Sequence, residues 1–400
     1  MRSVEEHQRV VARLFTPRDP IQVPLAEALG LALAADVVAP LSLPGFDNSA
    51  MDGFAVYADD IAAATAESPV TLPVADDIPA GRTDTGALKT GTAQRIMTGA
   101  PLPTGATAVV PVEATDADFS TTSANVAIRT AAKDGQHIRR AGEDVAAGTT
   151  VLRTGQVLTP AALGLAAALG FGELTVLPRQ RVLVMSTGSE LVAPGTPLLP
   201  GQIYESNAVM LAAAVRDAGA EVVASPMVGD DVDAFRSALD AHAGSADLII
   251  TTGGVSAGAY EVVKDALTDG VEFVKVAMQP GMPQGCGTVA GASIVTLPGN
   301  PVSSLVSFEV FVRAPLRAAM GLPADRPRVT LALTDDLTSP KGKRQFRRGV
   351  LAGATVTGYG PPASHHLRWL ASSNCLLDIP EDVDHLAAGS PVVVWDLSAG

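Results

Sequence analysis

From Arg179 to about Arg326 the chain alternates between short apolar runs and helical patterns, and this alternation is the strongest constraint on its fold. Five runs read as strands: Val182–Met185, Glu221–Ala224, Leu248–Thr251, Phe273–Ala277 and Ile294–Leu297. Helical patterns lie at about Ala208–Ala218, Val232–Ala241, Tyr260–Leu267 and after Pro301. Such alternation predicts a doubly wound, largely parallel sheet with right-handed crossovers, because parallel strands are joined by helices that cover the sheet.

The loops that follow these strands share a polar, glycine-rich character. Four of them stand out: Ser186–Glu190, Gly229–Asp231, Gly253–Gly258 and Leu297–Ser304. In the last loop, Asn300 is expected to cap a helix that has Pro301 at its first position. Since ligands of doubly wound sheets bind at the carboxyl ends of the strands, the sequence predicts a binding site at this edge.

The glycine turn after Leu248–Thr251 has two open interpretations. Gly253, Gly254 and Gly258 permit backbone angles with φ > 0 and a close approach of the backbone to a ligand. A turn between strand and helix also presents N–H groups that suit a phosphate or another oxyanion. Glycine turns of this kind serve packing as often as anion binding, so the turn alone does not decide.

The rest of the chain reads as β-rich, so the predicted fold class is multi-domain, α/β plus β. Ser3 and Glu6 form a capping-box pattern ahead of an N-terminal helix, and a second helical segment covers Leu25–Leu29. Short strand-like runs between Gly, Pro and Asp predict an inserted β domain over 44–135. Residues 1–43 and 136–178 then form an elongated mixed domain, 179–326 the α/β domain, and 327–400 a C-terminal β-barrel-like domain.

Three charged loops lie outside the α/β pattern. Asp47 and Asp52 lie in Pro44–Ala55, a loop whose acids serve either Asx turns or a site. The segment His137–Val145 carries two arginines and two acids around one glycine. The basic run Lys341–Arg348 is either a solvated face or an anion contact.

The net charge of −14 disfavours nucleic acid and acidic membranes as partners, so an anionic ligand needs local cations, backbone N–H groups or a bound metal. Two cysteines provide neither a disulfide framework nor a zinc site. No apolar run is long enough to span a bilayer, and the N-terminus lacks a signal core. A cytoplasmic location is expected.

Seven segments, in order along nearly the whole chain, resemble the MoeA family of molybdopterin molybdenumtransferases, which includes the C-terminal domain of gephyrin. They are Pro44–Ala55 (PGFDNSAMDGFA), Ile96–Pro103 (IMTGAPLP), Ile138–Val145 (IRRAGEDV), Ser186–Leu191 (STGSEL), Gln202–Asn207 (QIYESN), Gly253–Ser256 (GGVS) and Leu297–Ser303 (LPGNPVS). The resemblance implies a homodimer of four-domain subunits, with sites between the α/β domain of one subunit and domains of the other. Residues 179–326 would then be the molybdopterin-binding domain.

The resemblance also implies the reaction. Molybdate enters the dithiolene of adenylylated molybdopterin, the pyrophosphate link is cleaved, and AMP and molybdenum cofactor leave, with Mg²⁺ as the assisting cation. Mg²⁺ prefers oxygen ligands and bridges phosphates, which explains why carboxylates are tolerated beside an anionic substrate.

Site residues are expected in two groups. The carboxylates expected to act in catalysis are Asp52, Asp144, Glu190, Asp230 and Glu261, with Asp52, Glu190 and Asp230 as metal ligands. The expected substrate contacts are Thr98, Arg139, Ser186, Thr187, Gly188, Gly253, Gly254, Ser256, Lys275, Pro298, Gly299, Asn300 and Pro301.

The chain departs from the family pattern at three positions. Many relatives carry Asp where Glu261 stands, and lysines are frequent at the positions of Gln279 and Met282. Two alternatives therefore stay open beside molybdate insertion. One is the preceding adenylyl transfer to molybdopterin, and the other is a non-catalytic paralogue or scaffold.

Overall fold

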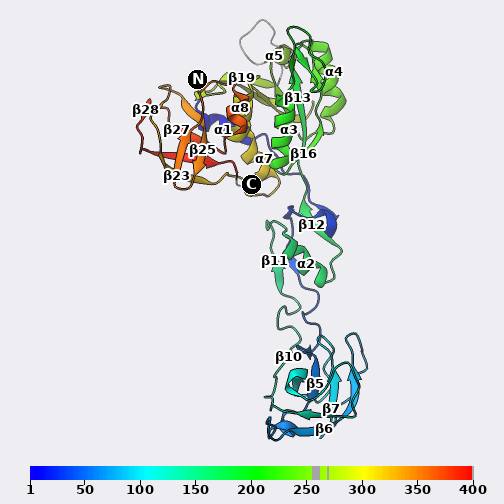
Figure 1. Ribbon diagram of the computed structural model, residues 1–400. Coiled ribbons are helices and arrows are strands. Elements are labelled where there is room, and N and C mark those ends of the chain that lie inside the picture. The colour runs from blue at the N-terminus through cyan, green and yellow to red at the C-terminus, as the bar shows by residue number, and fades with distance from the viewer. Residues whose placement is uncertain (255–261, 268–269, 399–400) are drawn as a thin grey trace. The chain divides into compact units, whose positions relative to one another are not determined.

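The computed structural model describes residues 1–254, 262–267 and 270–398. It separates into two compact units, one made of Met1–Ala34 and Leu174–Gly400, the other of Ala35–Glu173. Figure 1 colours both units along the chain. Two units are a coarser division than the four expected domains, so the four boundaries stay predictions.

The first unit is built around a largely parallel sheet, as the alternation predicts. Its parallel strands are β13 (Arg181–Thr187), β16 (Glu221–Ala224), β17 (Met227–Val228), β18 (Leu248–Thr252) and β22 (Ala292–Leu297). The order across the sheet is β16-β13-β18-β22-β21-β19, with β17 also beside β13. The first strand in sequence, β13, thus lies inside the sheet, as a doubly wound topology requires.

Helices cover both faces of this sheet because successive strand residues point to opposite sides. On one face, Val184, Ile250 and Val295 join a core that includes residues of α3 (Asn207–Asp217) and α6 (Pro301–Ser307). On the other face, Leu183, Ile249 and Ile294 pack in a core with residues of α4 (Val232–Ala243) and α5 (Val262–Ala266). Figure 1 shows α3 and α4 on either side of β13.

The far edge of the sheet differs from the expectation. β19 (Val271–Lys275) begins two residues before the predicted strand and runs antiparallel to β21 (Pro283–Val289). The sequence does not predict β21, since its residues PQGCGTV include the glycines and proline of a loop. These glycines are a steric requirement, because a Cβ on Gly287 would lie 1.9 Å from the carbonyl oxygen of Gly270.

The N-terminal helix begins as predicted. In α1 (Val4–Ala12) the hydroxyl of Ser3 accepts a hydrogen bond from the N–H of Glu6 at 3.1 Å. The second predicted helical segment is only the 3₁₀ turn η1 (Leu25–Glu27). The remaining elements of this part are β1 (Ile21–Pro24), β2 (Ala32–Leu33), β12 (Glu173–Leu177), β14 (Leu191–Val192), β15 (Ile203–Tyr204), the π-helical η4 (Phe308–Val312) and α7 (Arg313–Ala319).

The C-terminal part of the first unit contains a closed five-stranded barrel, as predicted. Around the ring the strands are β25 (Arg344–Ala352), β26 (Thr355–Gly358), β23 (Arg328–Leu333), β29 (Pro391–Asp396) and β27 (Cys375–Ile379), which pairs again with β25. Smaller elements flank the barrel: β20 (Met278–Gln279), β24 (Leu337–Thr338), α8 (Leu367–Ala371) and β28 (His385–Leu386).

Lys341 at the start of the basic run is exposed, but the arginines that follow in β25 are not a solvated face. Arg344 donates to both carboxylate oxygens of Asp378, at 2.7 and 2.6 Å. Arg348 is only 3% exposed and donates to backbone carbonyls of the loop at 361–366. Burial lowers the pKa of Arg347 and of Arg348. Within the described structure these three arginines therefore support the barrel.

The second unit holds a five-stranded β sheet and a small helical part. The sheet order is β8 (Ala108–Pro111), β5 (Gly53–Val56), β7 (Ala93–Ile96), β6 (Val70–Ile78) and β9 (Asn125–Ile128). The other elements are β3 (Val37–Val38), β4 (Asn48–Ser49), η2 (Ala58–Ile61), η3 (Val112–Ala114), β10 (Ile138–Arg139), β11 (Thr150–Leu152) and α2 (Pro160–Ala168).

Helix α2 gives a prediction about stability. Gly164 lies in the helix interior, is exposed, and a Cβ built there meets no atom within 4 Å. Replacing glycine by alanine at such a site reduces the entropy of the unfolded chain. We expect Gly164→Ala to raise the free energy of unfolding of the second unit by about 0.5–1 kcal/mol, measured by urea denaturation. A destabilised variant would contradict the assignment of Gly164 to a regular helix.

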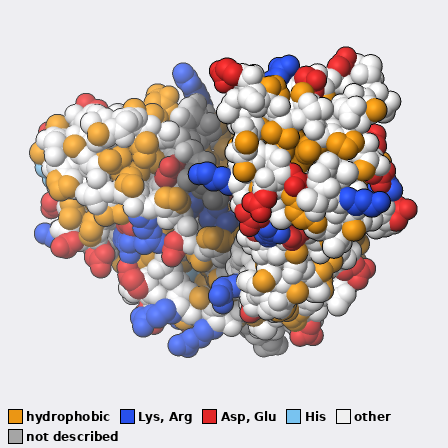
Figure 2. Space-filling view, turned by 90° about the horizontal axis from the view of Figure 1, so that it is seen from below, with side chains coloured by type: hydrophobic (Ala, Val, Ile, Leu, Met, Phe, Trp, Pro, Cys, Tyr) orange, Lys and Arg blue, Asp and Glu red, His pale blue; other side chains and the backbone are white. Residues whose placement is uncertain are grey.

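The net negative charge of the chain does not appear as one continuous acidic surface on the face seen in Figure 2. Acidic, basic and apolar side chains are interspersed there over the visible surface. An anionic ligand therefore depends on the local surroundings of its site, which the loops at the strand ends provide.

Candidate functional site

The carboxyl ends of the parallel strands surround one cavity of about 640 Å³. Residues of all four predicted loops line it. The expected site residues among them are Ser186, Thr187, Gly188, Glu190, Asp230, Gly253, Gly254, Gly299, Asn300 and Pro301. The structure thus brings these side chains and turns together, and their chemical roles stay predictions.

The glycine turn after β18 has the conformation that its sequence predicts. Gly253 and Gly254 have φ of 95° and 63°, in the left-handed region that favours glycine. A Cβ on Gly253 would lie 2.6 Å from the carbonyl oxygen of Thr187, and one on Gly254 would lie 2.9 Å from the Cγ2 of Val263. The N–H of Gly253 donates to the carbonyl of Leu297 at 3.4 Å, so this group serves the turn itself.

Two neighbouring loops are joined by hydrogen bonds between Ser189 and Asp230. The N–H of Ser189 donates to Oδ2 of Asp230 at 3.0 Å, and the N–H of Asp230 donates to the Ser189 hydroxyl at 2.8 Å. The next acid, Asp231, instead caps α4 by accepting from the N–H of Ala234 at 2.7 Å. Glu190 lies over Gly188, where a Cβ would be 2.8 Å from Oε2 of Glu190. Asp230 and Glu190 are therefore the acids that this cavity offers from two predicted loops.

Several polar atoms around the cavity lack partners. Ser186 Oγ, Thr187 Oγ1 and Asn207 Oδ1 are buried and make no hydrogen bond with the described residues. The amide nitrogen of Asn207 is used, because it donates to the carbonyl of Gly299 at 2.6 Å and to Thr252 Oγ1 at 3.2 Å. Since buried polar groups are normally paired, unpaired ones at a cavity point to a polar ligand.

A second cavity of about 400 Å³ shares Asn300 and His365 with the first. Pro298 lines it, together with Gln279 and Ser303. Lys275 is exposed at the end of β19 and lines neither cavity. Asn300 occupies the N-cap position of α6, but its side chain makes no capping hydrogen bond, so that part of the prediction was wrong. The N–H of Val302 is bonded instead to the carbonyl of Ser364, at 3.0 Å.

Three expected site residues of the second unit can be placed on their loops. Asp52 accepts a hydrogen bond of 2.6 Å from the N–H of Thr98, and this bond lowers the pKa of the Asp52 carboxyl. Arg139 lies in β10, opposite Asn48 of β4. Asp144 is exposed, and its N–H donates to the carbonyl of Leu43 at 3.1 Å. Thr98, the partner of Asp52, is a fourth expected site residue of this unit.

Asp47, in the same loop as Asp52, has a structural role. Its carboxylate accepts from Arg140 at 2.6 Å and from the N–H of Ala141 at 2.8 Å. These two bonds, with that from the N–H of Ala141 foremost, lower the pKa of the Asp47 carboxyl. Of the two acids of this loop, Asp47 thus ties its loop to the segment at 138–145.

Two expected residues, Ser256 and Glu261, lie outside the described residues. Other lining residues are not predicted by the sequence as site residues: Leu191, Ile203, Tyr204, Glu205, Ser206, Asn207, Thr252, His365 and Leu367. Tyr204–Asn207 belong to the segment QIYESN, so the family resemblance contained a signal for them. No sequence pattern marks His365, which reaches the cavity through tertiary structure.

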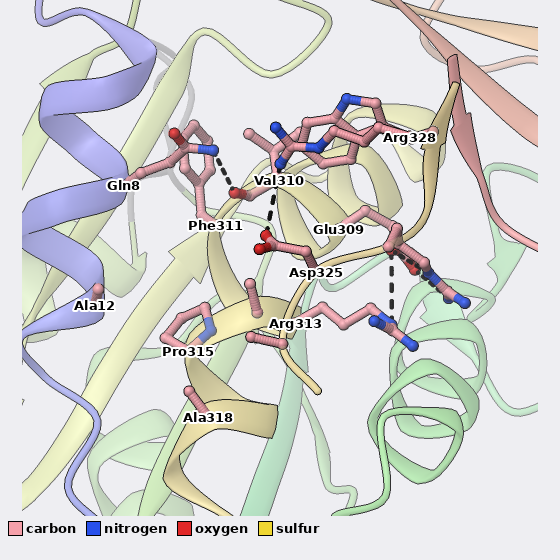
Figure 3. Close-up of a pocket in the computed structure, with 14 residues that line it drawn as sticks. Gln8, Ala12, Glu309, Val310, Phe311, Arg313, Pro315, Ala318, Asp325 and Arg328 are labelled. Carbon is pink, nitrogen blue, oxygen red and sulfur yellow. Dashed lines mark hydrogen bonds and ion pairs between the residues drawn. The ribbon is translucent and has the colours of Figure 1, made fainter. Parts of the chain in front are cut away.

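Another cavity, of about 300 Å³, lies away from the strand ends (Figure 3). Its walls are largely apolar, with Ala12, Phe311 and Pro315 among the lining residues. Some of its polar groups are paired, since Gln8 donates to the carbonyl of Val310 at 3.1 Å and Asp325 lies 3.7 Å from Arg328 (Figure 3), whereas Nε and Nη2 of Arg313 make no hydrogen bond with the described residues. The residues that the sequence predicts for the site do not line this cavity.

Two features are absent from the described part of the chain. No described helix has the length and apolarity needed to cross a membrane. No cluster of three or more His, Cys, Asp or Glu side chains suited to a metal ion occurs within 1–254, 262–267 and 270–398.

Comparison with known proteins identifies the family. Residues 2–170 match the MoeA N-terminal region (domain I and II), 183–318 a probable molybdopterin binding domain, and 330–397 the MoeA C-terminal region (domain IV). The chain is 68% identical over its full length, and that of the relative, to molybdopterin molybdenumtransferase 2 of Mycobacterium tuberculosis. It is 38% identical to molybdopterin molybdenumtransferase 1 of the same organism, over 98% of each chain.

Solved structures agree with the sequence families. A crystal structure of the molybdopterin biosynthesis MoeA protein from Pyrococcus horikoshii is similar with a TM-score of 0.82 and 28% identity, over 99% of this chain and 98% of that one. A second structure of that protein has a TM-score of 0.78. The chain therefore belongs to the MoeA family of molybdopterin molybdenumtransferases.

Proposed function

We propose that this protein inserts molybdate into adenylylated molybdopterin, with Mg²⁺ as cofactor and release of AMP. The observation that carries the proposal is the convergence of Glu190, Asp230 and the glycine turn at Gly253–Gly254 on one cavity of about 640 Å³. A cavity at the carboxyl ends of parallel strands, rich in oxygen donors and lined by glycine turns, suits an adenylylated phosphate ester. The unpaired polar atoms of Ser186, Thr187 and Asn207 support a polar ligand there.

The residues present fit a magnesium ion. Mg²⁺ usually takes one or two carboxylates together with waters and phosphate oxygens, and Glu190 and Asp230 offer two carboxylates at the same cavity. When bound, the ion would neutralise charge on the pyrophosphate oxygens. Ser189 holds the Asp230 carboxylate through its backbone N–H, which fixes the direction of that ligand. Asp52 is the third ligand in the proposal.

The other expected residues keep their proposed roles. Asp144 and Glu261 assist as carboxylates. Thr98 and four further residues are proposed to contact the two anionic substrates, in addition to the turns already described. The four are Arg139, Ser256, Lys275 and Pro298. The protein is proposed to act in the cytoplasm as a homodimer, with adenylylated molybdopterin and molybdate as its ligands.

The test is direct. Purified protein is incubated with adenylylated molybdopterin and Mg²⁺, with and without molybdate, and AMP and pterin-bound molybdenum are quantified. We expect AMP release and molybdenum incorporation to rise together on addition of molybdate. If AMP never appears and wild type equals Asp52→Ala, the proposed reaction is wrong.

A further inference from the structure

One side chain, His365, lies at the junction of the two cavities at the strand edge. The cavities of about 640 and 400 Å³ share Asn300 and His365 and no other described lining residue. Asn300 and His365 therefore face both cavities, so a ligand in either one can meet these two side chains. The substrate of the proposed function carries groups at both ends of a pyrophosphate, so it offers phosphate oxygens away from its two ends.

The charge of the two linings is unbalanced. Among the described lining residues, the larger cavity carries the acids Glu190, Glu205 and Asp230, and the smaller one carries no acid. His365 is the one basic side chain among the described residues that line either cavity. None of the residues outside the described ranges is Lys, Arg or His, so none of them adds a cation. Among the described lining residues, an oxyanion in either cavity thus meets a single side chain that can carry positive charge.

Arg348 supports the loop that carries His365 through hydrogen bonds to its backbone. This arginine is 3% exposed and donates to the carbonyl oxygens of Ala363 and His366, at 3.2 and 3.3 Å, and to that of Pro361. A buried guanidinium whose partners are carbonyls of one loop fixes the course of that loop. Its donors are directed to these carbonyls, so Arg348 itself lines neither cavity.

Further contacts fix the same loop from its other sides. The carbonyl of Ser364, next to His365, accepts from the N–H of Val302 at 3.0 Å. Tyr359 packs edge-to-face on Trp369, with ring centroids 4.9 Å apart. The imidazole of His365 itself lies 4.3 Å from that of His366, centroid to centroid. The exposed ring of His365 is therefore presented at the junction by a well-supported backbone.

We propose that His365 is a specificity-determining contact of this site, which donates an imidazole N–H to an oxyanion of the substrate and supplies the positive charge that the rest of the lining lacks. A protonated imidazole donates from both ring nitrogens and carries a positive charge, so it binds an oxyanion more strongly than a neutral ring does. The inference rests on the proposed function for the identity of the substrate. The shared chemistry is that of a phosphate or molybdate oxygen.

Other titratable and charged groups surround His365. His366 contacts its ring, and the acids Glu190, Glu205 and Asp230 line the larger cavity. Glu205 is committed to the fold, because its carboxylate accepts from the N–H groups of Ala208 and Val209. On α8, Arg368 lies over the Trp369 ring at 5.4 Å. Because these groups also contribute charge at the site, the test compares anion binding by the variants at the same pH.

The experiment titrates the full chain, in Mg²⁺ buffer, with sodium molybdate and separately with inorganic pyrophosphate, by calorimetry at pH 6 and pH 8. The variants are His365→Gln, which keeps a neutral N–H donor, and His365→Ala, which removes the donor. His385→Ala is the matched control, because His385 is also an exposed histidine of the C-terminal part and lines neither cavity. For at least one anion we expect His365→Gln, which cannot carry the charge, to weaken binding about tenfold at pH 6, and His365→Ala, which also removes the donor, to weaken binding at both pH values.

The outcomes separate the possibilities. An effect on molybdate alone assigns His365 to molybdate, and an effect on pyrophosphate alone assigns it to the phosphates; both support the contact. The proposal is overturned if wild type binds neither anion, if His365→Gln equals wild type at both pH values for both anions, or if His385→Ala shows the same loss. AMP release by wild type is assayed in parallel, so a failure of the proposed reaction is recognised separately from a failure of this contact.

Discussion

Asp230→Asn is expected to lower the rate of AMP release about 100-fold while leaving the unfolding temperature close to that of wild type. The substitution removes one charge and keeps an oxygen that can accept from the N–H of Ser189. Loss of a group that only orients a metal ligand typically costs roughly 10–100-fold in affinity or activity, so we expect a loss of about 100-fold for a direct ligand. The Mg²⁺ concentration for half-maximal activity should rise in the same variant, which steady-state assays over a Mg²⁺ series measure.

The adjacent acid provides a matched control for this prediction. Asp231 accepts from the N–H of Ala234 as the N-cap of α4 and does not line the cavity. Asp231→Ala should therefore lose about 1 kcal/mol of stability and keep the Mg²⁺ dependence of wild type. If Asp231→Ala impaired catalysis as much as Asp230→Asn, the loop as a whole, and not the Asp230 carboxylate, would be responsible.

The central sheet and its binding edge were predictable because their signals are local. The strands β13 and β18 contain uninterrupted apolar runs, and such runs read as buried strands when Gly and polar residues end them. The position of the site then follows from topology, since parallel strands place the loops after them at one edge. Ser186–Glu190, Asp230 and Gly253–Gly254 therefore meet around one cavity, as the sequence predicts.

What could not be predicted depends on contacts between distant segments. His365 reaches the cavity because Arg348 holds its loop through carbonyls, and no periodicity encodes such a contact. Similarly, the helix-capping prediction for Asn300 assumes an isolated helix, whereas the carbonyl of Ser364 bonds to the N–H of Val302. The basic run resembles a surface feature in sequence, but Arg344 is neutralised by Asp378, which is far away along the chain. Local patterns cannot anticipate partners of this kind.

The missed strand β21 illustrates a conflict between propensity and packing. Glycine is disfavoured in strands, so PQGCGTV reads as a loop. In the structure Gly285 and Gly287 face backbone and side chains so closely that any other residue would collide: a Cβ on Gly285 would lie 2.2 Å from Thr296 Oγ1. The same glycines that conceal the strand in the sequence are what allow β19 and β22 to pair with it on both sides.

Gly287→Ala is accordingly expected to be strongly destabilising. The new Cβ would lie 1.9 Å from the carbonyl oxygen of Gly270 and 2.8 Å from the Cα of Val271, so backbone must move and pairing between β19 and β21 must weaken. We expect a loss of about 3 kcal/mol or more in the free energy of unfolding, and a fall of roughly 6–12 °C in unfolding temperature. Gly291→Ala is the control. Gly291 lies two residues beyond the end of β21, has φ of 80° and has open space around it. The substitution there introduces backbone strain without a steric contact, so we expect it to cost about 1 kcal/mol of stability. Urea and thermal denaturation measure the stability of both variants. If the two variants lose equal stability, steric contact at Gly287 does not explain why this strand carries glycine.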